Sequence, residues 1–211
     1  MNIAIIDYGS GNLRSVAKAF ERAAAANASQ VKVISQAAAL KEATHIVLPG
    51  VGAFGDCMRG LLALPGMRDA LEEEVMGRQK PFLGICVGMQ LMFDKGYEHG
   101  EHDGLGWIKG EIRPIEPKNP QDKIPHMGWN DLILDNPKHP MLHGVAPGEH
   151  AYFVHSYHAQ CKDARDVVAS VEYGGQSITA VVGREQLQGT QFHPEKSQET
   201  GLKLIGNFLT L

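Results

Sequence analysis

The chain has 211 residues, of which 43% are hydrophobic and 21% charged, a balance typical of a soluble globular protein. A net charge of -4 leaves no basic surface for a polyanion, so we expect no nucleic-acid partner. The sequence contains no run of 18 apolar residues, and Asp7 interrupts the first apolar segment early. We therefore expect no membrane span or signal peptide, a cytoplasmic location, and a single domain over residues 1–211.

Cysteine and histidine spacing gives no sign of a metal site. The three cysteines are far apart in the sequence, which excludes both a disulfide framework and a Cys-x-x-Cys metal motif. The pair His99/His102 lies in a polar loop, and the pair His139/His143 is interrupted by Pro140, so neither pair is held on a regular element. We predict that the protein holds no metal ion.

The first 90 residues alternate between short apolar runs and segments with helical periodicity. This alternation predicts a parallel, doubly wound α/β sheet with right-handed crossovers. The expected strands are 2–6, 31–34, 45–48 and 81–85, and the expected helices are 13–26, 57–64 and 67–76.

The second half of the chain has a different pattern. Prolines and polar turns separate runs in which apolar and polar residues alternate, which predicts antiparallel or mixed strands on the flank of the parallel sheet. A final helix presents an apolar face that contains Leu202, Ile205 and Leu209. The expected strands are 107–115, 129–134, 151–157, 167–173, 178–183 and 187–192.

Three turns, 8–12, 49–54 and 86–90, follow strands of the predicted parallel sheet. Ligands bind beyond the carboxyl ends of such strands, so we expect these turns to converge on one site. Gly9 and Gly11 suggest a dinucleotide fingerprint, but its third glycine would fall at Arg14. We therefore predict no nucleotide cofactor.

The most informative stretch is Gly84-Ile85-Cys86-Val87-Gly88, which lies between an apolar run and a possible helix over 89–95. A strand, a sharp turn and a helix form the context of a nucleophile elbow. We expect a strained backbone at Cys86, with the flanking glycines allowing strand and helix to pack closely. The alternative is an inert cysteine buried beside a glycine-rich turn.

A thiolate nucleophile needs a base, and the base needs a group that orients it. His193 and Glu195 supply both functions within two residues, and Pro194 between them fixes the backbone so that the two side chains can face each other. Taken alone, this segment is more typical of a turn than of a catalytic pair. Together with a cysteine elbow, it completes the set of groups needed for acyl transfer.

The segments 84–90 and 191–195 resemble the motifs of the class I glutamine amidotransferases, whose Cys-His-Glu triad hydrolyses glutamine to glutamate and ammonia. The segments 49–52, 126–130 and 152–157 resemble those family members that serve histidine biosynthesis. All motifs occur in the family's order along the full chain. The resemblance implies a flavodoxin-like α/β fold, with Val87 as a conservative departure from the usual leucine.

The resemblance implies a role for each triad residue. Cys86 attacks the γ-carboxamide carbon of glutamine, His193 takes the thiol proton and returns it to ammonia, and Glu195 orients the imidazole. The oxyanion needs backbone donors. The family pattern assigns them to the N–H of Val87 and to an N–H of the movable strand Gly50-Val51-Gly52.

Further roles follow from the same resemblance. The implied glutamine-binding residues are Gln90, His155, Ser156 and Tyr157. The implied partner is a separate (β/α)8-barrel synthase, which this chain is too short to contain, and no cofactor is implied. The implied docking residues are Asn12, Trp129 and Lys196. Apolar alternation predicts that Tyr152 and Phe153 belong to the core instead.

Two other interpretations fit part of the sequence. A related glutaminase that serves another acceptor would keep Cys86, His193 and Glu195 but would lack the segment 126–130. A non-enzymatic binding subunit would carry substitutions in the triad, and this sequence has none.

Overall fold

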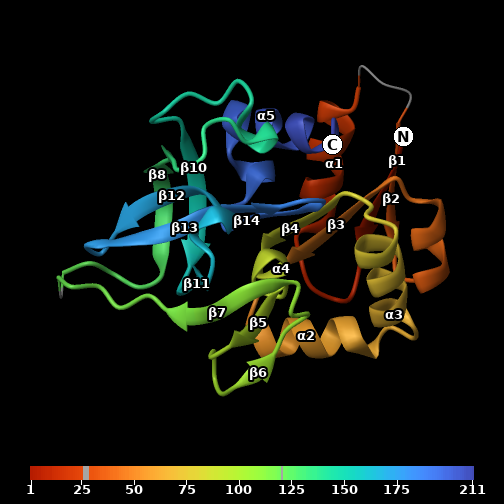
Figure 1. The fold of residues 1–211 in the computed structure, drawn as a ribbon, viewed down its shortest axis with the longest axis horizontal. Coiled ribbons are helices and arrows are strands. Elements are labelled where there is room, and N and C mark those ends of the chain that lie inside the picture. The colour runs from red at the N-terminus through yellow and green to blue at the C-terminus, as the bar shows by residue number, and fades with distance from the viewer. Residues whose placement is uncertain (26–28, 120) are drawn as a thin grey trace.

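The computed structural model describes residues 1–25, 29–119 and 121–211. Its main feature is an eight-stranded sheet (Figure 1). The first five strands of the sheet are parallel to one another, and the last three continue it in antiparallel fashion. In spatial order the strands are β2 (Gln30–Ile34), β1 (Asn2–Ile6), β3 (His45–Gly50), β4 (Phe82–Cys86), β14 (Leu187–Thr190), β13 (Gln176–Arg184), β12 (Val167–Tyr173) and β9 (Ile133–Leu134).

Helices cover both faces of the parallel half. On one face lie α1 (Leu13–Ala23) and α5 (Gln198–Phe208), and on the other lie α2 (Phe54–Ala63), α3 (Met67–Leu71) and α4 (Val87–Gln90) (Figure 1). Every residue of β3 and β4 is buried, as expected for strands covered on both sides. The predicted doubly wound α/β fold is confirmed.

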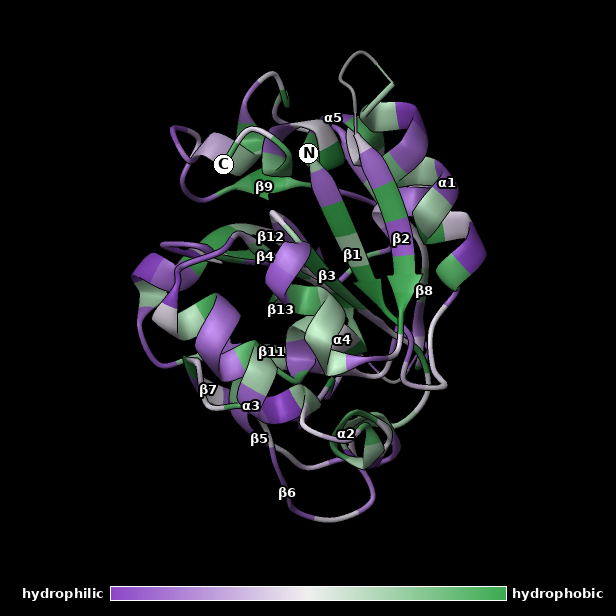
Figure 2. Ribbon diagram, turned by 90° about the vertical axis from the view of Figure 1, so that its right-hand side faces the viewer, coloured by the Kyte–Doolittle hydropathy of each residue, from purple (hydrophilic) through white to green (hydrophobic). Residues whose placement is uncertain are grey.

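The hydropathy of β1 and β2 fits their places in the sheet. The edge strand β2 alternates hydrophobic and hydrophilic residues and is largely exposed, whereas β1 is apolar and buried after Asn2 (Figure 2). Helix α1 turns Val16 and Phe20 into the core. The ring of Phe208 in α5 meets Phe20 at 6.2 Å between ring centroids, so the last helix packs on the first.

Two small sheets flank the main one, which confirms the predicted mixed strands of the second half. One pairs β11 (Tyr157–Cys161), β7 (Ile108–Pro114), β5 (Phe93–Gly96) and β6 (His102–Asp103). The other is a ribbon of β10 (His150–His155) and β8 (His126–Asp131). No helix within the described residues is both long and apolar enough to cross a membrane.

The predicted helix over 89–95 is wrong. After the single turn of α4 the chain becomes strand β5, because distant amides take the carbonyls that a longer helix would use. Leu105 N–H donates to Leu91 O, Trp107 N–H to Met92 O and Gly106 N–H to Phe93 O.

Other boundaries also differ. The predicted strand 151–157 divides between β10 and β11, and the predicted strand 129–134 divides between β8 and β9. The predicted helix 67–76 continues from α3 as a π-helical turn over Glu72–Gly77. The predicted extension of the first helix to Ala26 lies outside the described residues.

The two glycines of α5 provide a matched test of its packing. A Cβ added at Gly201 would lie 1.9 Å from Pro194 O, whereas a Cβ at Gly206 would meet no atom within 4 Å. We predict that Gly201→Ala destabilises the protein by about 1–3 kcal/mol through overpacking. Gly206→Ala should stabilise it by up to ~1 kcal/mol, because alanine favours a helix. Thermal unfolding measures both changes; equal melting temperatures for the two variants would contradict this packing.

Candidate active site

The elbow has the predicted geometry. Strand β4 ends at Cys86, whose φ of 55° and ψ of -114° are strained for a residue with a side chain, and α4 begins at the next residue. A Cβ at Gly88 would lie 1.8 Å from Leu48 O, and one at Gly84 would lie 2.6 Å from the Met89 backbone. The two glycines therefore permit the close contact of strand and helix that holds the Cys86 side chain at the turn.

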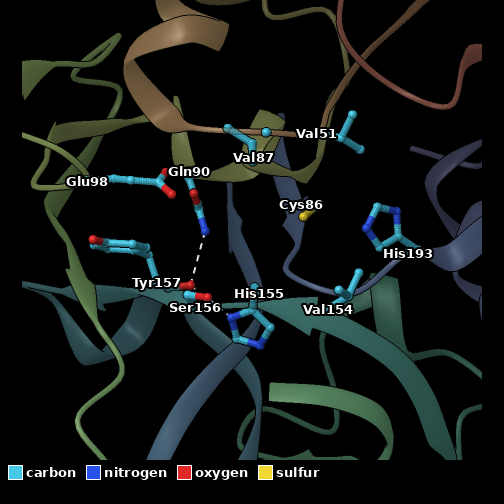
Figure 3. Close-up of a pocket in the computed structure, with 11 residues that line it drawn as sticks. Val51, Cys86, Val87, Gln90, Glu98, Val154, His155, Ser156, Tyr157 and His193 are labelled. Carbon is cyan, nitrogen blue, oxygen red and sulfur yellow. Dashed lines mark hydrogen bonds between the residues drawn. The ribbon is translucent and has the colours of Figure 1, made fainter. Parts of the chain in front are cut away.

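The Cys86 side chain lines a cavity of about 200 Å³ (Figure 3). This cavity collects most residues that the sequence analysis assigned to chemistry or glutamine binding. The lining residues are Val51, Gly52, Cys86, Val87, Gln90, Glu98, Val154, His155, Ser156, Tyr157 and His193. The turns that follow β3 and β4 therefore converge at this cavity, as expected. The third turn, 8–12, contributes no lining residue and reaches the site through the bond of Ser10 to Val51.

His193 and Glu195 form a buried pair. The Nδ1–H of His193 donates to Glu195 Oε1 at 2.9 Å, and their side chains are only 4% and 1% exposed. Because Nδ1 is engaged by the carboxylate, the Nε2 atom remains for chemistry. A short 3-10 turn over Pro194–Lys196 directs the Glu195 side chain back toward His193. The Ser197 hydroxyl stabilises this turn by donating to His193 O at 2.7 Å.

The surroundings of His193 favour its charged form. Burial lowers the pKa of His193, but interactions with Cys86 and Glu195 outweigh burial and raise this pKa to about 10. An imidazolium beside the sulfur is the state expected after the thiol has given up its proton. The pair can therefore hold a proton that a leaving group later needs.

The strand assigned to the oxyanion hole runs beside the elbow, with Gly50 opposite Cys86 in the parallel register. The N–H of Val51 donates to Ser10 Oγ at 3.1 Å, and the Ser10 hydroxyl donates in turn to Val51 O at 2.5 Å. The Cys57 thiol also donates to Val51 O, at 3.4 Å. The Val51 amide is therefore engaged by Ser10 instead of being free to bind an oxyanion.

Gln90 and His155 converge on one backbone carbonyl in the cavity wall. Gln90 Nε2 donates to Tyr157 O at 3.1 Å, and His155 Nδ1–H donates to the same oxygen at 2.8 Å. His155 Nε2 then accepts from His126 Nδ1–H at 2.9 Å. Burial lowers the pKa of His155 to about 3 and that of His126 to about 4, so both rings are neutral.

Glu98 is a site residue that the sequence analysis missed. It lies between β5 and β6, and its Oε2 accepts the N–H of Phe54 at 2.7 Å. Among the described residues that line the cavity, it carries the one carboxylate. No spacing pattern could have found it, because it reaches the cavity through the pairing of β5 with β7.

The three residues assigned to docking lie outside the cavity lining. Trp129 is 46% exposed, and its ring lies 5.8 Å from that of Tyr152. Lys196 Nζ lies 5.9 Å from the centre of the Tyr152 ring. Asn12 precedes α1, where its carbonyl accepts from the first turn.

The core assignment was right for Phe153 and wrong for Tyr152. Phe153 is fully buried, but Tyr152 is only half-buried and lies beside Trp129. Successive side chains of strand β10 point to opposite faces, so one residue of this pair must face outward.

Within residues 1–25, 29–119 and 121–211, no group of three or more His, Cys, Asp or Glu side chains is placed to hold a metal ion. The cavity brings together the Cys86 thiol and the His193 imidazole, with the Glu195 carboxylate bonded to that imidazole. This set suits acyl transfer through a covalent thioester.

Comparisons with known proteins agree with this chemistry. The chain is 56% identical to imidazole glycerol phosphate synthase subunit HisH of Rhodospirillum rubrum, over 99% of this chain and 98% of that protein. It is 53% identical to the subunit of the same name in Cereibacter sphaeroides, over 100% and 99%.

Solved structures share the fold at low identity. A glutamine amidotransferase matches with a TM-score of 0.73 at 16% identity, over 98% of this chain and 97% of that one. The glutaminase domain of Trypanosoma brucei CTPS with bound acivicin matches with a TM-score of 0.68 at 16% identity, over 100% and 94%. The family model "Glutamine amidotransferase class-I" matches residues 4–210. The chain therefore belongs to the class I glutamine amidotransferase family.

Proposed function

We propose that this chain is the glutaminase subunit of an imidazole glycerol phosphate synthase and supplies ammonia for histidine biosynthesis. The observation that carries the proposal is a strained cysteine beside a histidine–glutamate pair, in a chain that matches subunits of that name over nearly its whole length. The ammonia would pass to a separate (β/α)8-barrel subunit in a cytoplasmic heterodimer. The proposed glutaminase is a single domain over residues 1–211.

The triad would act in two steps. The Cys86 sulfur attacks the γ-carboxamide carbon of glutamine while His193 holds the thiol proton. Collapse of the tetrahedral intermediate breaks the C–N bond, and His193 gives that proton to the departing ammonia. Water then attacks the thioester with His193 as base, which releases glutamate and restores the thiol. Glu195 keeps the imidazole in the required tautomer.

Oxyanion stabilisation would depend on a movable peptide. The N–H of Val87 begins α4 beside the sulfur, which suits one donor. A second donor from Val51 requires that its N–H leave Ser10 Oγ and turn toward the cavity. One such donor is typically worth ~3 kcal/mol in catalysis. Gly50 and Gly52 flank this peptide and would let it rotate, so partner docking could switch the site on.

Glutamine recognition would use the end of the cavity away from His193. Gln90 Nε2 donates one proton to Tyr157 O and the other to Gln191 Oε1. The Oε1 of Gln90 is therefore left as an acceptor beside Glu98 (Figure 3). A carboxylate and an amide oxygen together suit the α-ammonium group of the substrate. His155, Ser156 and Tyr157 would form the remaining wall.

The proposed docking face is continuous with the cavity. Val154 lines the cavity. Tyr152, two positions earlier in the same strand, lies between Trp129 and Lys196 on the outside. An exposed aromatic group with a nearby cation is typical of an interface core and its rim. Asn12 would extend this face from the start of α1.

The first test of this function removes the nucleophile. We predict that Cys86→Ala abolishes glutamine-dependent synthesis by the complex, while synthesis from added ammonium salt continues. The reason is that ammonia replaces only the product of the Cys86 step. Cys161→Ala, which changes a cysteine outside the cavity, should keep both activities. Glutamate release and imidazole glycerol phosphate are measured with and without the barrel subunit; wild-type complex that releases no glutamate would reject the function.

The second test concerns the hydrogen bonds that hold Val51. We predict that Ser10→Ala raises glutamine hydrolysis by the isolated subunit about two- to tenfold, because one hydrogen bond contributes ~0.5–1.5 kcal/mol. Ser15→Ala, near the start of α1, is the matched control and should leave the rate unchanged. Steady-state glutamate release without partner measures the effect. A Ser10→Ala rate equal to wild type would show that this bond does not restrain the site.

The third test concerns the α-ammonium subsite. We predict that Glu98→Gln raises the KM for glutamine by about tenfold or more, because a charged hydrogen bond becomes a neutral one. The glutamine side chain can still accept from Phe54 N–H, so the loop should stay in place. Glu101→Gln in the same hairpin is the control, since Glu101 pairs with Lys95 outside the cavity. An unchanged KM in Glu98→Gln would remove Glu98 from substrate binding.

A further inference from the structure

Gln191 is a buried polar residue beside the nucleophile. It follows β14 and precedes His193 by two positions, and its side chain is fully buried. Its Nε2 atom lies 3.8 Å from Cys86 Sγ, within hydrogen-bond distance for sulfur. Its Oε1 atom accepts from Gln90 Nε2 at 3.0 Å. The carboxamide thus lies between the nucleophile and the proposed substrate-binding residue.

A fixed acceptor determines which end of each amide faces which neighbour. The carbonyl oxygen of Tyr157 can only accept, so the Gln90 atom beside it must be the Nε2 donor. The second proton of that Nε2 requires an acceptor, so Gln191 must present its oxygen to Gln90. The atom that Gln191 presents to the sulfur is therefore an N–H donor.

We infer that Gln191 is a further catalytic residue, whose carboxamide N–H holds the Cys86 sulfur and favours its thiolate form. This inference rests on the proposed glutaminase function, in which Cys86 is the nucleophile. A neutral thiol is a weak acceptor, whereas a thiolate is a charged one, so the N–H bond strengthens when the proton leaves. A buried environment with little water makes this difference larger.

The sulfur is then held by two groups of different kind. His193 interacts with it as the proton carrier, and Gln191 as a donor that never titrates. Cys57 and Tyr8 are further titratable groups close enough to influence this site electrostatically. Burial raises the pKa of both groups, so both stay neutral, and Glu195 acts through His193.

Gln90, which donates to Gln191, is itself held in place by further hydrogen bonds. Tyr157 O also accepts from His155 Nδ1–H, and the ring of His155 is fixed by His126. Asn130 Nδ2 donates to His126 Nε2 at 3.2 Å and to Glu172 O at 3.0 Å. Gln90 is thus held by a chain of defined donors and acceptors. Its proposed contact with substrate and its bond to Gln191 belong to the same side chain.

The test measures the state of the sulfur itself. Full-length wild type, Gln191→Met and Gln188→Met are alkylated with iodoacetamide over a range of pH, and modified Cys86 is quantified by mass spectrometry. Gln188 is a matched control, since it is buried in β14 but donates to Glu185 O. We expect Gln191→Met to raise the pH midpoint of alkylation by about one unit and to lower kcat about ten- to hundredfold. Gln188→Met should match wild type.

Two results would overturn the inference. One is a wild-type midpoint in Gln191→Met, and the other is an equal shift in Gln188→Met. If circular dichroism shows that Gln191→Met is unfolded, Gln191→Glu is tested in its place. This variant keeps an oxygen for Gln90 but places a carboxylate beside the sulfur. It must therefore raise the pH midpoint of alkylation as well. The alkylation result does not depend on glutamine hydrolysis. A midpoint shift in a chain whose complex releases no glutamate would reject the proposed function alone.

Discussion

The close approach of α4 to strand β3 is the constraint on which the site depends. Gly88 lies so near Leu48 O that any side chain would collide with it, and a side chain at Gly84 would collide with the backbone at the start of the helix. This contact lies directly beside the strained turn at Cys86, and the parallel pairing of β3 with β4 places Gly50 opposite Cys86. The nucleophile and the strand proposed for the oxyanion hole thus lie side by side at this point of close packing. A looser elbow would misplace both together.

Strand β14 joins the two halves of the sheet at this point. It is parallel to β4 and antiparallel to β13, and its register places Thr190 beside Ile85. The chain beyond β14 therefore emerges next to Cys86, which brings Gln191 and His193 to the sulfur from a site about 100 residues away in the sequence. Strand β4 thus contributes the sulfur, and the chain that follows the neighbouring parallel strand β14 contributes the groups proposed to act on it.

Features that depend on neighbouring residues could be predicted from the sequence, while those that depend on long-range pairing could not. The apolar strands, the elbow and the His193–Glu195 pair are all local, and the structure contains each of them. Glu98 lies in the turn between β5 and β6 and is held at the cavity by the distant N–H of Phe54, and the amides of residues 105–107 end the helix expected over 89–95. The Ser10–Val51 bond joins two turns that are 41 residues apart. No periodicity encodes such contacts, since they arise from the register of separate strands.

The neutral histidines of the wall complete the electrostatics of the proposed site. Among the residues that line the cavity, Glu98 lies near Gln90 and Tyr157, and His193 lies beside Cys86 (Figure 3). A cationic His155 between them would repel both the α-ammonium group of glutamine and a charged His193. Burial prevents this, since the pKa of His155 falls to about 3 and both of its ring nitrogens are engaged. The cavity can therefore contain one positive imidazole where a proton is needed and none where the substrate brings its own charge.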